Sequence, residues 1–110
     1  MIDQVSAIEL HQLMANTTVR LIDVREQWEF DSGHVPGAQW LPMALVPVRK
    51  EEFVSAHPVY VICRTGARSG QVVAWLAQQG IAATNVAGGT QLWGQQGYPI
   101  ETAQPTGRMA

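Results

Sequence analysis

Short apolar runs alternate with helical segments along the chain, and this order constrains the fold more than any other feature. Strands are predicted over residues 19–24, 39–42, 59–62 and 83–87, and helical segments over residues 6–16, 26–32, 48–55, 69–79 and 90–96. Such alternation favours βαβ units, in which helices connect parallel strands. The sequence therefore predicts an α/β fold with a mostly parallel sheet and helices on both of its faces.

Local signals support individual elements of this order. Ser6 and Glu9 have the spacing of a capping box, which marks the start of the first helix. The run Val59-Tyr60-Val61-Ile62 is apolar without interruption, which is typical of a strand covered on both faces. The tryptophans are interpreted as core and loop-packing residues, namely Trp28, Trp40, Trp75 and Trp93.

The length of 110 residues suits one compact domain, which we assign to residues 1–101. The polar segment 102–110 is interpreted as a flexible C-terminal tail. The formal net charge is −2 and the basic residues form no cluster, which argues against a nucleic-acid partner. The apolar runs are too short to span a bilayer, and the first residues lack the pattern of a secretory signal. These observations predict a cytoplasmic protein that does not bind a membrane.

Cys63 is the single cysteine of the chain. An intramolecular disulfide is therefore impossible, and one cysteine with three scattered histidines predicts no metal site. A lone cysteine is often a small buried hydrophobe. Its neighbours in the sequence must therefore decide whether it is reactive.

The loop that follows Cys63 has the features of a thiolate site. It begins at the end of an apolar strand and leads into a helix, so its amides and the helix N-terminus can stabilise an anion. Gly66 can adopt the positive φ that a tight loop requires. Thr65 offers a hydroxyl donor, and Arg68 is expected to face an anionic substrate. The pattern predicts that Cys63 is a nucleophile.

A cysteine loop of this kind serves two chemistries, attack on phosphorus and attack on sulfane sulfur. A phosphoryl group needs a cradle for three oxygens, whereas a persulfide adds one sulfur atom. Four residues separate Cys63 from Arg68, one fewer than in tyrosine-specific and dual-specificity phosphatases. The loop length favours sulfur transfer and leaves a phosphatase or an arsenate reductase as the weaker alternative.

Four motifs, in order, resemble those of rhodanese homology domains, and together they span about residues 6–100. They are Leu21-Ile22-Asp23-Val24-Arg25-Glu26 with Trp28-Glu29-Phe30, Gly33-His34-Val35-Pro36-Gly37-Ala38, Cys63-Arg64-Thr65-Gly66-Ala67-Arg68-Ser69, and Val86-Ala87-Gly88-Gly89 with Trp93, Gly97 and Pro99. The resemblance implies a rhodanese-like three-layer domain with a five-stranded, mostly parallel sheet.

The resemblance also implies a function, that of a sulfurtransferase of the thiosulfate sulfurtransferase (rhodanese) type. Such an enzyme moves sulfane sulfur from thiosulfate or a small anionic persulfide to cyanide or a thiol, which can belong to a protein. The intermediate is a covalent persulfide on Cys63, and no further cofactor is implied. The residues expected to bind the substrate or the persulfide are Arg64, Thr65, Gly66, Ala67, Arg68 and Ser69. A sulfur-relay or binding module that acts on a protein partner remains the main alternative.

Supporting roles are predicted for residues at the other strand ends. Asp23 is interpreted as a structural residue that accepts N–H bonds at the end of its strand. His34 is interpreted as a hydrogen-bonded loop residue, because a cysteine that is already ionised needs no general base. Gly88 and Gly89 are expected to permit close approach of the backbone.

Two further residues are candidates for the lining of the pocket. Arg25 is expected either to line it or to pair with Glu26 or Glu29 at the surface. Trp93 is placed near the pocket because its helix follows the Gly88-Gly89 turn.

Overall fold

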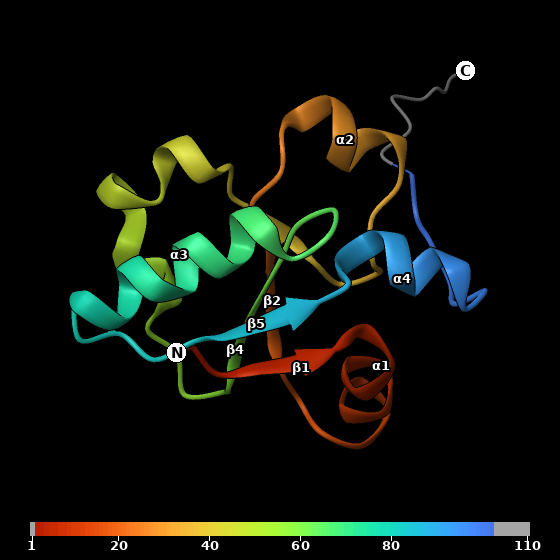
Figure 1. The fold of residues 1–110 in the computed structure, drawn as a ribbon, viewed down its shortest axis with the longest axis horizontal. Coiled ribbons are helices and arrows are strands. Elements are labelled where there is room, and N and C mark those ends of the chain that lie inside the picture. The colour runs from red at the N-terminus through yellow and green to blue at the C-terminus, as the bar shows by residue number, and fades with distance from the viewer. Residues whose placement is uncertain (1, 103–110) are drawn as a thin grey trace.

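The computed structural model describes residues 2–102, and these residues form a five-stranded sheet flanked by helices (Figure 1). All neighbouring strands are parallel, and their order across the sheet is β1-β5-β4-β2-β3. The strands are β1 (Gln4–Ser6), β2 (Arg20–Asp23), β3 (Gln39–Trp40), β4 (Val59–Ile62) and β5 (Thr84–Ala87). The predicted α/β fold with a parallel sheet is confirmed.

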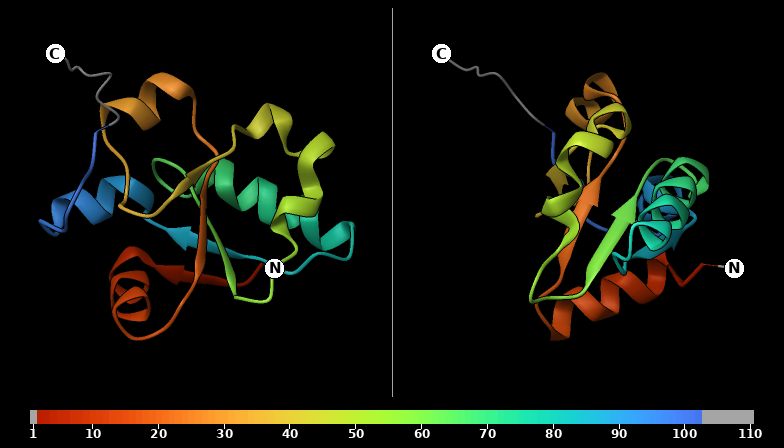
Figure 2. Two further views of the ribbon diagram at one scale, coloured as in Figure 1. Left: turned by 180° about the vertical axis from the view of Figure 1, so that it is seen from behind. Right: turned by 90° about the vertical axis from the view of Figure 1, so that its left-hand side faces the viewer.

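Helices cover both faces of the sheet, as Figure 2 shows in the edge-on view. They are α1 (Ala7–Asn16), α2 (Gln27–Ser32), α3 (Ala67–Gln78) and α4 (Gly89–Gln95), with the 3₁₀ helices η1 (Met43–Leu45) and η2 (Pro47–Phe53). Helices α1 and α4 pack on one face, whereas α3, η1 and η2 pack on the other. The helix predicted over residues 48–55 is therefore present as 3₁₀ turns.

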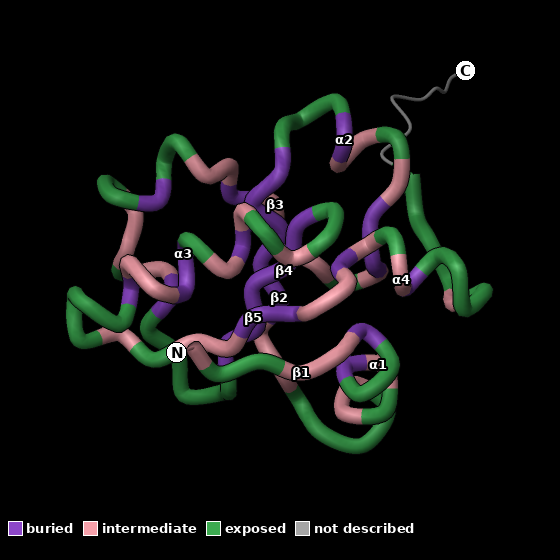
Figure 3. Tube along the Cα trace, in the orientation of Figure 1, coloured by how far each residue is buried: buried purple, intermediate pink, exposed green. Residues whose placement is uncertain are grey.

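The position of β4 at the centre of the sheet explains why its sequence is apolar throughout. Val59 and Val61 point into the core beneath α3, and Tyr60 and Ile62 point into the core beneath α1 and α4. Successive side chains of a strand alternate between the two faces, so a strand covered on both sides must be apolar at every position. Figure 3 shows the resulting band of buried residues along β2, β4 and β5.

The N-terminal strand β1 was missed by the sequence-based prediction, which began with a helix at residue 6. Ser6 serves both elements, because it ends β1 and also caps α1. Its Oγ accepts from the Glu9 amide at 3.0 Å, and its own amide donates to Glu9 Oε1 at 2.8 Å. A three-residue edge strand with a single apolar residue, Val5, is too short for an alternating pattern to reveal it.

The prediction that Trp28 packs in the core is wrong, because this side chain is 72 % exposed on α2. The prediction of a flexible tail falls on residues 102–110, of which 103–110 lie outside the described residues. Over residues 2–102, no helix combines the length and apolar character needed to cross a membrane.

The parallel topology brings three strand ends together at one edge of the sheet. Asp23 ends β2, Cys63 follows β4, and Gly88 follows β5. Ligand sites of parallel α/β sheets form at the carboxyl ends of the strands. The residues singled out in the sequence therefore meet at the edge where such a site is expected.

Candidate active site

Cys63 lies at the centre of this edge, immediately after β4. The residue is 1 % exposed, and its sulfur is held by the loop that follows it. The Gly66 amide donates to Sγ at 3.1 Å, and the Ser69 hydroxyl lies 3.2 Å from the same atom. The loop hydrogens thus point at the sulfur, as an anion-binding loop requires.

The neighbouring helix α4 fixes the orientation of this loop. The carbonyl oxygens of Cys63 and Arg64 accept from the amides of Thr90 at 2.9 Å and Gln91 at 3.0 Å. The Thr65 carbonyl accepts from the amide of Gly88 at 3.2 Å. Because the C=O and N–H of a trans peptide point in opposite directions, carbonyls bound to α4 turn the following amides toward the sulfur.

Two glycines make this arrangement possible. Gly66 has φ +104°, which an L side chain rarely adopts, and it is the N-cap residue that precedes α3. Gly89 has φ +57°, and a Cβ added there would lie 2.5 Å from the carbonyl oxygen of Arg64 and closer still to that of Cys63. The backbone at Gly89 therefore packs directly on the loop, in the close approach that the sequence analysis expected.

The pKa of the Cys63 thiol is set by two opposed effects. Burial is the largest effect and raises the pKa, because it disfavours the charged form. The Ser69 hydroxyl and the amides of Ser69, Gly66 and Thr65 lower it, and together they outweigh burial. The net pKa of Cys63 lies below the usual value, so its thiolate forms more readily than that of an ordinary buried cysteine.

Arg68 is held by a carboxylate of α2. Its two terminal nitrogens donate to the Glu29 oxygens at 2.8 and 2.9 Å, in the forked geometry that arginine favours. The hydrogen bond from Arg68 lowers the pKa of Glu29 to about 2 and raises that of Arg68 itself. This pair connects the start of α3 to α2, and the guanidinium that was expected to face substrate is bound within the protein.

Arg25 is also paired, with a partner that the sequence analysis did not name. Its guanidinium donates to the buried Asp23 carboxylate at 2.8 Å and to the Gly33 carbonyl at 2.8 Å. Asp23 accepts the Arg25 amide as well, at 3.1 Å. The expected partners Glu26 and Glu29 are not the ones found, although Arg25 also contributes to the wall of the cleft described below.

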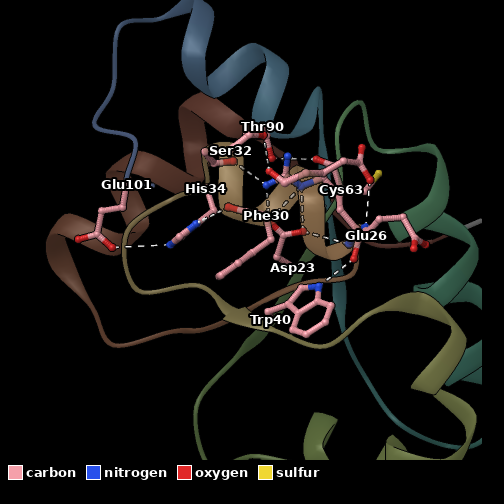
Figure 4. A network of polar contacts seen from close by, with 12 residues as sticks. Asp23, Glu26, Phe30, Ser32, His34, Trp40, Cys63, Thr90 and Glu101 are labelled. Carbon is pink, nitrogen blue, oxygen red and sulfur yellow. Dashed lines mark hydrogen bonds and ion pairs between the residues drawn. The ribbon is translucent and has the colours of Figure 1, made fainter. Parts of the chain in front are cut away.

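His34 is a structural residue of the loop between α2 and β3. Its Nδ1 lies 2.7 Å from the Phe30 carbonyl, and its ring stacks on that of Phe30. Its backbone pairs with Glu101 in an isolated antiparallel bridge. In Figure 4, His34 lies on the Glu101 side of the polar network, away from Cys63.

An open cleft of about 420 Å³ lies beside the cysteine loop. Its walls come from α2, the loop and the start of α4, through Arg25, Trp28, Glu29, Ser32, Arg64, Thr90 and Gln91. Among residues 2–102, Arg64 has no acidic partner, whereas Arg25 and Arg68 are both paired. The exposed cation of the cleft is therefore Arg64.

One residue that was predicted to line the cleft lies elsewhere, and other residues found at the site were not predicted there. Trp93 does not line the cleft: its ring packs in the core beneath α1 and α4, and its indole N–H donates to the Pro99 carbonyl at 2.7 Å. Trp28 lines the cleft instead. Glu29 and Asn85, which bind Arg68 and Ser69, were not assigned to the site. The sequence signal that could have identified Asn85 was a polar residue within a buried strand.

The chain matches the family described as "Rhodanese-like domain" over residues 6–96. It is 39 % identical to a protein of Allochromatium vinosum named "Sulfurtransferase", over 91 % of this chain and 95 % of that protein. It is 31 % identical to the "Thiosulfate sulfurtransferase GlpE" of Stutzerimonas stutzeri, over 80 % of this chain and 81 % of that protein. The crystal structure of a rhodanese-like domain protein from Staphylococcus aureus superposes with a TM-score of 0.83 at 32 % identity, over 94 % of this chain and 100 % of that one.

Proposed function

Because the chain belongs to the rhodanese-like domain family, we propose that it is a sulfurtransferase in which Cys63 carries sulfane sulfur as a persulfide. The observation that carries the proposal is the set of hydrogens directed at Sγ by Gly66 and Ser69. These donors favour a sulfur anion at Sγ, which is the species that must attack the donor.

In the first half-reaction, the Cys63 thiolate attacks the outer sulfur of thiosulfate or of a small persulfide. The new Sγ–S bond forms as the S–S bond of the donor breaks, and sulfite or a thiolate leaves with the electron pair of that bond. The charge that the thiolate brings is balanced by the sulfite or thiolate that leaves, and the transferred outer sulfur keeps its own negative charge in the Cys63 persulfide. The loop amides then stabilise this charge, in an electrostatic role that persists through the step.

In the second half-reaction, an acceptor thiolate or cyanide attacks the outer sulfur. The Sγ–S bond breaks, its electron pair returns to Sγ, and the acceptor leaves as a persulfide or as thiocyanate. Cys63 is regenerated as a thiolate and no external oxidant is required. Two half-reactions that share one covalent intermediate give ping-pong kinetics.

The cleft beside the loop supports an anionic donor that is larger than one sulfur atom. Arg64 offers a guanidinium without an acidic partner among residues 2–102, and Trp28 offers an exposed aromatic surface on the opposite element α2. A guanidinium forks onto sulfonate-like or carboxylate oxygens. We assign the recognition of the donor anion to Arg64, because Arg68 is held by Glu29.

The test is steady-state sulfur transfer with thiosulfate and with glutathione persulfide as donors, and with cyanide and a thiol as acceptors. Parallel double-reciprocal plots are expected with at least one donor, and Cys63→Ser is expected to abolish transfer. Near-normal transfer by Cys63→Ser would refute the mechanism. Hydrolysis of an aryl phosphate that depends on Cys63 would instead favour a phosphatase.

A further inference from the structure

The hydroxyl group of Ser69 faces two acceptors, although it carries a single hydrogen. Its Oγ lies 3.2 Å from the Sγ of Cys63 and 2.6 Å from the Oδ1 of Asn85. A serine hydroxyl donates one hydrogen bond, and neither a thiolate nor an amide oxygen can donate one. The two contacts therefore compete for the same hydrogen whenever Cys63 is ionised.

The orientation of the Asn85 side chain is fixed by its other partners. Its Nδ2 donates to the carbonyl oxygen of Gly66 at 3.2 Å and to Gln4 Oε1 at 3.3 Å. A backbone carbonyl only accepts, so the amide nitrogen must face Gly66 and Oδ1 must face Ser69. Asn85 is 3 % exposed and Ser69 is completely buried, so a lost hydrogen bond is costly here.

The two charge states of Cys63 satisfy this network differently. In the thiol form, the S–H can donate to Ser69 Oγ while the Ser69 hydroxyl donates to Asn85. In the thiolate form, the hydroxyl hydrogen is attracted to the sulfur. Asn85 Oδ1 then loses the hydrogen bond from Ser69, which is its donor among residues 2–102. Ionisation of Cys63 therefore costs the hydrogen bond to Asn85.

We propose that Asn85 is a positioning residue that controls the direction of the Ser69 hydroxyl and, through it, how readily Cys63 ionises. The role in the reaction cycle rests on the proposed function. In a persulfide, the charge lies on the outer sulfur and Sγ becomes a weak acceptor, so the hydroxyl returns to Asn85. Asn85 thus gives Ser69 a partner in each state in which Sγ carries no charge.

The charged groups around Cys63 do not take part in the competition between Cys63 and Asn85 for the Ser69 hydrogen. Strand β5 (Thr84–Ala87) and helix α4 (Gly89–Gln95) contain no charged residue. The groups contributed by β2, α2, the loop and α3 are carboxylates and guanidinium groups, and two pairs of them bind each other. They are Asp23 paired with Arg25, Glu29 paired with Arg68, and the exposed Arg64.

The test measures the thiolate fraction of the reduced, persulfide-free protein by ultraviolet absorbance as a function of pH, with Cys63→Ser as the baseline. Asn85→Ala removes the competing acceptor and is expected to lower the pKa of Cys63 by roughly 0.5–1 unit. Ser69→Ala removes the donor and is expected to raise it. Asn16→Ala, at an exposed asparagine of α1, is the matched control and is expected to leave the pKa unchanged.

The double variant separates this role from a merely structural one. With Ser69 already replaced by alanine, Asn85→Ala is expected to cause no further shift. A raised or unchanged pKa in Asn85→Ala alone, or an equal shift in both backgrounds, would overturn the inference. If Asn85→Ala does not fold, Asn85→Leu keeps the volume, removes the acceptor and allows the same comparison. The titration uses no sulfur donor, so its result is independent of the transfer assay that tests the proposed function.

Discussion

Replacement of Gly89 by alanine places a Cβ atom 2.5 Å from the carbonyl oxygen of Arg64 and nearer still to that of Cys63. Both oxygens belong to backbone, so the contact cannot be relieved by rotation of a side chain. The start of α4 must move away from the cysteine loop. Such a movement breaks or lengthens the bonds from Thr90 and Gln91 that orient the loop.

The cost can be worked out from its parts. An alanine at φ +57° costs roughly 1–2 kcal/mol for the left-handed conformation alone. Loss of the two hydrogen bonds to the loop adds about 0.5–1.5 kcal/mol for each bond. We therefore expect Gly89→Ala to lower the free energy of unfolding by about 2–5 kcal/mol. The pKa of Cys63 should rise as well, because the loop amides turn away from the sulfur.

Gly80→Ala is the matched control. Gly80 has φ +78°, and a Cβ there would have no heavy atom within 4 Å, so this variant carries the conformational cost without the contact. Urea denaturation gives the two free energies of unfolding, and the rate of alkylation against pH gives the pKa of Cys63. Equal destabilisation of the two variants, with the same pKa of Cys63, would refute the claim that the approach at Gly89 orients the loop.

Three further results are expected. Glu29→Gln should lower the free energy of unfolding at pH 7, because the ionised Glu29 carboxylate, with its lowered pKa, stabilises the fold. The difference in free energy of unfolding between variant and wild type should vanish as the pH falls from about 4.5 to about 2, where this carboxylate becomes protonated. Urea denaturation at several pH values measures the difference, and one that persists at pH 2 would contradict the expectation. Arg64→Ala should raise the KM for thiosulfate about three- to tenfold, with a smaller salt dependence than the wild type; an unchanged KM would remove Arg64 from donor recognition. Trp28→Ala should raise the KM for glutathione persulfide more than the KM for thiosulfate, whereas the control Val48→Ala, at another exposed apolar residue, should change neither KM. Equal effects of Trp28→Ala on both KM values would contradict a role of Trp28 in binding the larger donor, glutathione persulfide.

The sequence predicted the elements whose signals are local. The continuous apolar run of β4, the glycine in the loop and the amphipathic helix after it lie within about twenty residues, and together they placed Cys63 correctly. The capping box of Ser6 and Glu9 was also predicted and found. Each of these features depends on neighbours in the chain, so each leaves a pattern that can be read.

The parts that were missed depend on contacts between distant segments. Arg68 was expected to face substrate, but only the fold brings Glu29 of α2 within 2.8 Å of it. Hydrophobicity suggested that Trp28 is buried, yet α2 is short and leaves this side chain over the cleft. The contact between Ser69 and Asn85 joins α3 to β5. No local pattern distinguishes such a contact from an ordinary buried polar residue.

The most direct test of the account is the mass of the protein after reaction with a sulfane-sulfur donor. Reduced protein is mixed with thiosulfate or glutathione persulfide, separated from the donor and measured intact, and the modified peptide is then identified. We expect a gain of one sulfur atom on the peptide that contains Cys63, lost again on addition of cyanide. Protein that gains no sulfur from either donor, or that gains it equally when Cys63 is replaced by serine, would contradict the central claim.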